Sequence, residues 1–77
     1  MIQKYNLEFV LYAHNGSVRA IKNSLTEFGD KLEVTDCEGE SEKGKNFKVN
    51  ISTEDPTMIF DICSHFGRIK SVRVNEA

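Results

Sequence analysis

Few residues of this 77-residue chain have side chains suited to catalysis or to metal binding. The histidines are His14 and His65, the cysteines are Cys37 and Cys63, and acidic residues gather at 36–42. Cys63 and His65 are two residues apart on a predicted helix, where their side chains would diverge by about 200°. Cys63 is expected to be buried, because free cysteine behaves as a small hydrophobe, and the acidic run lacks the alternating ligands of a calcium loop. We therefore predict no metal, no cofactor and no enzymatic activity.

The connection after the first predicted strand is the best candidate for a ligand site. It contains His14, Asn15, Gly16 and Ser17. Gly16 permits close approach of the backbone, and the start of the next helix offers free N–H groups to an anion or carboxylate. His14 would add a switchable charge. The alternative is a plain strand–helix turn in which Asn15 or Ser17 caps the helix.

Hydrophobic periodicity predicts the elements that position this connection. Apolar residues alternate over 5–13 and again from Phe47 to Ile51, which indicates half-buried strands. Apolar residues at three- and four-residue steps predict a helix over 17–28, and Asp55-Pro56 is typical of the start of a second helix. Shorter alternating runs follow each helix, at 32–37 and 72–74. The charged, glycine-bearing segment 38–45 is predicted to be a solvated hairpin loop.

The two halves of the chain resemble each other at an offset of 38 residues. Phe9 falls on Phe47, and Phe28-Gly29 falls on Phe66-Gly67, where each glycine is expected to end a helix, Gly29 as a left-handed cap. Such a repeat predicts a single α+β domain over 1–77 with the order βαββαβ, the ferredoxin-like arrangement. Right-handed crossovers would place both helices on one face of a four-stranded antiparallel sheet whose first and third strands are central.

The same alternation divides the strand residues between the two faces of the sheet. The residues expected to face the helices are Leu7, Phe9, Leu11, Val34, Phe47, Val49 and Ile51. In the last strand, Val72 and Val74 are expected to alternate with Ser71 and Arg73. The residues expected on the open face are Glu8, Val10, Tyr12, Thr35, Lys48, Asn50, Ser71 and Arg73. This mixed face is where a partner or a second copy would pack.

Composition limits the partners and the location. The formal net charge is −2 and the sequence pI is about 5.6, which makes nucleic acid an unlikely main partner, since most such binders are basic. The chain has no apolar run long enough to span a membrane and no signal-peptide pattern at its start, so we expect a cytoplasmic location. A domain this small buries little surface, and docking to a second copy would stabilise it.

The chain resembles an ACT domain, a small βαββαβ regulatory module. Gly16 and Val18 lie where that family has its glycine turn and the first apolar residues of the helix, and residues 66–74 are similar to its last helix turn and closing strand. The resemblance implies a homodimer with an amino acid or similar metabolite bound at the interface, near Asn15, Gly16 and Ser17. We therefore expect a regulatory, ligand-binding module.

Two other functions remain open at this point. One is a protein–protein adaptor that takes no small ligand. The other is binding of single-stranded RNA on the open sheet face by Tyr12, Lys48, Asn50 and Arg73.

Overall fold

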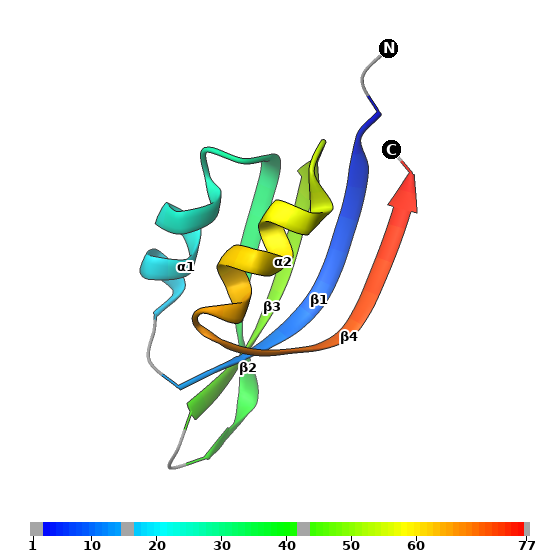
Figure 1. The fold of residues 1–77 in the computed structure, drawn as a ribbon. Coiled ribbons are helices and arrows are strands. Elements are labelled where there is room, and N and C mark those ends of the chain that lie inside the picture. Colours follow the sequence, from blue (N-terminus) through cyan, green and yellow to red (C-terminus); the bar gives the residue numbers. More distant parts are fainter. Residues whose placement is uncertain (1–2, 15–16, 42–43, 77) are drawn as a thin grey trace.

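The computed structural model describes residues 3–14, 17–41 and 44–76. Its elements, in chain order, are β1 (Tyr5–Ala13), α1 (Val18–Leu25), β2 (Asp30–Ser41), β3 (Gly44–Thr53), α2 (Pro56–Ser64) and β4 (Gly67–Glu76). The strands form one antiparallel sheet in the order β2-β3-β1-β4 (Figure 1). The predicted α+β class, with a four-stranded antiparallel sheet and two helices, is therefore confirmed, and β1 and β3 are the central strands.

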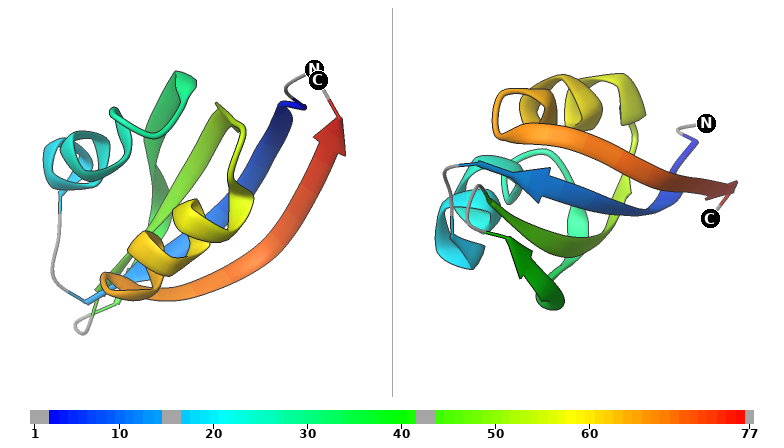
Figure 2. Two further views of the ribbon diagram at one scale, coloured as in Figure 1. Left: turned by 45° about the horizontal axis from the view of Figure 1, so that its top comes forward. Right: turned by 90° about the horizontal axis from the view of Figure 1, so that it is seen from below.

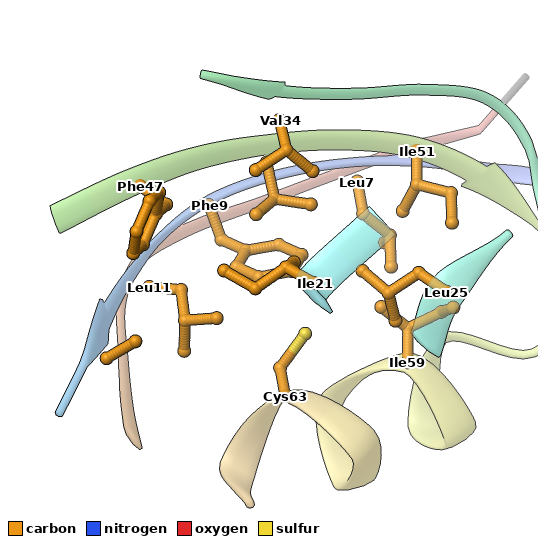
Figure 3. Close-up of a cluster of buried hydrophobic side chains, with 12 residues drawn as sticks. Leu7, Phe9, Leu11, Ile21, Leu25, Val34, Phe47, Ile51, Ile59 and Cys63 are labelled. Atoms are coloured by element: carbon orange, nitrogen blue, oxygen red, sulfur yellow. The ribbon is translucent and has the colours of Figure 1, made fainter. Parts of the chain in front are cut away.

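The helices cover a single face of the sheet, and the core lies beneath them. Ile21 and Leu25 of α1, together with Ile59 and Cys63 of α2, join the buried side chains of the strands (Figure 3). The rings of Phe9 and Phe60 meet edge to face at 5.5 Å. The strand residues predicted to face the helices are buried, namely Leu7, Phe9, Leu11, Val34, Phe47, Val49 and Ile51. The right-hand view of Figure 2 shows the twist of the sheet, with α2 above the strands and α1 beside them at the left.

Both helices begin at side-chain caps. The Ser17 hydroxyl accepts a hydrogen bond from the backbone N–H of Ala20 at 3.2 Å, and the Asp55 carboxylate accepts one from Met58 at 3.1 Å. Each cap satisfies one of the donors that a helix start leaves free. Pro56 follows Asp55 at the first turn, as the sequence predicts. Neither helix in the described part of the chain is long and apolar enough to cross a membrane.

The helix ends differ from the prediction. α1 stops at Leu25, so Phe28 lies beyond the helix and is 40% exposed. Neither Gly29 nor Gly67 has a left-handed φ, and neither ends a helix. Each is glycine because another strand passes close by: a Cβ at Gly29 would lie 2.6 Å from the carbonyl oxygen of Ser52, and one at Gly67 would collide with the backbone of Tyr12.

The hairpin between β2 and β3 is also shorter than predicted. β2 continues to Ser41 and β3 starts at Gly44, and these two residues are paired. Much of the segment predicted as loop is therefore strand, because backbone pairing continues through charged residues where neither face needs to be buried. Residues 42 and 43 lie outside the described ranges.

Both edge strands contain a bulge. In β4, Lys70 pairs with Val10 and Arg73 pairs with Glu8, so two residues, Ser71 and Val72, face the single residue Phe9. Ser71 has a φ of 53°, the left-handed conformation found at one type of β-bulge. In β2 the register shifts between Asp30 and Glu33, and Lys31 has a φ of 54°. The predicted regular alternation of Val72 with Ser71 and Arg73 is wrong, since Val72 lies in the bulge and is 47% exposed.

Candidate functional site

The structure describes the two ends, His14 and Ser17, of the strand–helix connection that the sequence predicts to be a ligand site. Asn15 and Gly16 lie outside the described residues. The exposed His14 donates its backbone N–H to the carbonyl of Phe66 at 3.2 Å, and its ring meets that of Tyr12 edge to face at 5.2 Å. Ser17 uses its hydroxyl to cap α1. His14 therefore lies against the turn between α2 and β4, next to Tyr12 of the open sheet face.

The open face of the sheet is organised in rows across the strands. Directly paired residues of an antiparallel sheet lie on the same face, so the register assigns each row. The first two rows, read from β2 through β3 and β1 to β4, are Glu33–Asn50–Glu8–Arg73 and Thr35–Lys48–Val10–Lys70. The third row, read from β3 to β4, is Asn46–Tyr12–Arg68. In β1, Glu8, Val10 and Tyr12 alternate with buried residues, which confirms that the rows face away from the core.

Positive charge is concentrated on this face. The three rows contain four cations, Lys48, Arg68, Lys70 and Arg73, against the carboxylates Glu8 and Glu33. The whole chain has a net charge of −2, so the face is more positive than the rest of the molecule. Lys48 and Glu8 form an ion pair at 3.2 Å, and both side chains are well exposed, so solvent screens this pair. We refer to these three rows as the open face.

Tyr12 and Val10 form the apolar part of the open face. Both are half-buried, and the Lys70 ammonium lies 5.1 Å from the centroid of the Tyr12 ring. Lys48 and Lys70 flank Val10 on either side, and Arg68 is opposite Tyr12. The aromatic ring of Tyr12 is therefore bordered by cations. Such a surface suits binding of a ligand that combines a planar ring with negatively charged groups.

The bulge in β4 brings these cations together. Strict alternation would put Arg73 on the face opposite to Arg68 and Lys70, because odd and even positions of a strand point to opposite sides. The extra residue at Ser71–Val72 reverses the alternation, so Arg68, Lys70 and Arg73 all share the open face. Sequence reasoning found Tyr12, Lys48, Asn50 and Arg73 but missed Arg68 and Lys70. A serine at the bulge gives no signal of the kind that a glycine would.

A concave feature lies at the end of the sheet far from His14. It is an open cleft of about 350 Å³ between the α1–β2 turn and the start of α2. Phe28 and Met58 line it, and Lys4 and Asp30 form an exposed ion pair at 2.6 Å on its rim. Thr53 ties the two turns together, because its hydroxyl donates to the carbonyl of Phe28 at 2.7 Å and accepts from the N–H of Asp55 at 3.1 Å.

Shifted pKa values are found at Cys63 in the core and at the Lys4–Asp30 pair on the cleft. Burial raises the pKa of the Cys63 thiol to about 12, so it is protonated and unreactive in the folded chain. At the cleft, the hydrogen bond and charge of Lys4 lower the pKa of Asp30, and Asp30 raises the pKa of Lys4 in return. Among the residues that the structure describes, no three His, Cys, Asp or Glu side chains gather as a metal site.

Comparison with known proteins gives no family. No protein-family model matches the chain, and no curated protein matches it.

Proposed function

We propose that this chain is a ferredoxin-like, non-catalytic module that binds single-stranded nucleic acid on its open face. The strand order β2-β3-β1-β4, with helices inserted after β1 and β3 and packed on one face, supports the ferredoxin-like arrangement. This architecture leaves the two central strands uncovered on the other face. A binding surface on paired strands is rigid, which favours a role in recognition.

The observation that carries the proposal is the position of Tyr12 among the cations of β3 and β4. A base can stack on or beside the tyrosine ring, because every base has a π-face. The phosphates on either side would then reach Arg68 and Lys70 on β4 and Lys48 on β3. The backbones of β3 and β4 are two strand spacings apart, about 10 Å, so the charges cover a surface wider than one phosphate group.

The charge of the open face also sets the strength of the salt dependence. For single-stranded nucleic acid, the logarithm of the binding constant falls as the logarithm of the salt concentration rises, with a slope of about −0.7 per neutralised phosphate. Four cations give a slope of about −3, and it falls to about −2 if Glu8 keeps Lys48 engaged. The negative charge of the rest of the chain disfavours non-specific binding elsewhere. We therefore expect modest affinity that is confined to the open face.

Titration of labelled single-stranded RNA and DNA by fluorescence anisotropy, at several salt concentrations, tests this function. We expect binding at low salt that Lys70→Gln weakens severalfold. Lys22→Gln removes one exposed cation from α1, on the other side of the sheet, and is the matched control. Equal loss in the two variants, or no binding of the wild-type chain at low salt, would refute the proposal. Titration with mononucleotides is a separate experiment. If the chain binds a mononucleotide as tightly as an oligonucleotide, it is a nucleotide sensor and not a binder of single strands.

We also propose a second function, the sensing of an amino acid or similar metabolite by a cytoplasmic homodimer of this chain. It is supported by the exposure of His14, by the hydrogen bond that joins His14 to the α2–β4 turn and by the Ser17 cap at the start of α1. A ligand held there would contact both βα units. A thermal-shift screen of amino acids tests it, since a ligand at a hundredfold excess over its dissociation constant stabilises by about 2.7 kcal/mol. A flat screen would leave the open face as the only proposed site.

A further inference from the structure

The large apolar side chains left exposed in the described part of the chain fall in two places. Phe28 and Met58, each 40% exposed, line the cleft between the α1–β2 turn and α2. Val72 and Val74, 47% and 49% exposed, lie on the edge strand β4. Scattered single apolar residues are normal on a protein surface, whereas contiguous apolar patches mark interaction sites. Two different partners would bury these two apolar pairs, and so would one contact between two copies in which each pair covers the other.

The cleft is acidic around its apolar lining. Four carboxylates line it, from Glu27, Asp30, Glu54 and Asp55. The only cation among the lining residues is Lys4, and its ammonium is paired with Asp30 at 2.6 Å. An occupant of this cleft should therefore present apolar side chains together with positive charge.

The exposed edge of β4 has those properties. Arg73 lies between Val72 and Val74, and Lys70 comes just before the bulge. Glu76 is the only carboxylate of this strand. The cleft and β4 are thus complementary in charge, and both are incompletely buried in a single copy.

The two features lie at the same end of the molecule. Tyr5 of β1 pairs with Thr53, which lines the cleft, on one side and with Glu76 of β4 on the other. In Figure 1 the α1–β2 turn, the start of α2 and the tip of β4 all lie at the upper end. Within one copy, β1 and β3 separate β4 from the α1–β2 turn, so β4 does not fill its own cleft. A two-fold axis at this end allows each copy to give β4 to the other.

We infer that the chain self-associates by placing the Val72–Val74 edge of one copy in the Phe28–Met58 cleft of another. The contact buries the four exposed apolar side chains and neutralises the acidic rim with Arg73. It uses the edge of β4 and the cleft, and leaves Tyr12, Val10 and Lys48 of the open face uncovered. It shares Arg73 with the open face but covers neither the Tyr12 ring nor Lys48, so the inference does not rest on the nucleic-acid function and is tested on the chain without nucleic acid.

Sedimentation velocity on the full chain tests the contact. We expect a concentration-dependent dimer, and at least a tenfold weaker association for both Val74→Glu and Met58→Lys. Asn23→Lys, an exposed position on α1 that does not line the cleft, is the control and should associate like the wild type. Circular dichroism establishes that each variant is folded.

Mixing the two variants gives the decisive result. Val74→Glu keeps a native cleft and Met58→Lys keeps a native β4, so a mixed pair retains one intact contact and gains an opposite-charge pair at the other. We expect the mixture to associate where each variant alone does not. A wild-type chain that stays monomeric overturns the inference and leaves the cleft to a different partner. Association that neither variant weakens, or that mixing fails to restore, also overturns it.

Discussion

The ammonium of Lys70 lies 5.1 Å from the centroid of the Tyr12 ring, across the boundary between β4 and β1. The two residues are not directly paired, since Lys70 is opposite Val10 and Tyr12 is opposite Arg68. The contact is diagonal, at a separation that long and aromatic side chains can bridge. It joins a planar group and a cation into one recognition element on the open face.

Truncation of the Tyr12 side chain should weaken binding of single-stranded nucleic acid more than it changes stability. We expect Tyr12→Ala to cost about 1–3 kcal/mol of binding free energy, the usual worth of one base–aromatic stack. Tyr12→Phe keeps the ring and should bind within a few-fold of the wild type. Fluorescence anisotropy measures both. Equal binding by the alanine variant and the wild type would contradict a stacking role.

Ser71 should tolerate glycine and resist β-branched residues. Its φ of 53° is unfavourable for a side chain with a Cβ, and the left-handed region costs about 1–2 kcal/mol per residue. We therefore expect Ser71→Gly to equal or exceed the wild type in stability. Ser71→Val should lose about 1–2 kcal/mol, or shift the bulge. Urea unfolding followed by circular dichroism compares the two, and unchanged stability in Ser71→Val would mean that the position is not left-handed.

Gly67→Ala should be among the more damaging single substitutions. The new Cβ would collide with the backbone of Tyr12, and strand backbone cannot move aside as a flexible side chain can. We expect a loss on the order of 2–3 kcal/mol in urea unfolding. Arg68→Ala, at the next residue, is exposed and should stay within about 0.5 kcal/mol. Similar losses for the two variants would show that close packing at Gly67 is not the cause.

Cys63 should contribute to a loss of stability in alkali. Its pKa is raised from an ordinary value of 9.0 to about 12, so the folded state holds the proton more tightly than the unfolded state. The stability from this group is complete below pH 9 and declines as the pH rises from about 9 towards about 12. Cys63→Ala should be less stable at neutral pH, because it leaves a small cavity, and should show a shallower decline over that range. Chemical unfolding at several pH values measures both slopes, and parallel slopes would contradict the prediction.

The sequence predicts the interior of the fold well and its edges poorly. Phe9 and Phe47 follow from alternation, and the Asp55-Pro56 start of α2 follows from capping chemistry, because each depends on neighbours in the chain. The bulge at Ser71 depends on how β4 meets β1, which the local sequence does not encode. Arg68 and Lys70 were missed for that reason. The cleft was missed because Phe28 fits the helical spacing of α1, although the helix ends three residues earlier.

The two hydrogen bonds of the Thr53 hydroxyl have a consequence for the dynamics of the cleft. Its buried hydroxyl connects the carbonyl of Phe28 to the N–H of Asp55, so the two strand–helix connections that border the cleft share one hydrogen-bonded atom. Neither connection can open alone without breaking that link. Amide hydrogen exchange at Asp55 should therefore report on the movement of the α1–β2 turn, and the two walls of the cleft should fluctuate as one cooperative unit.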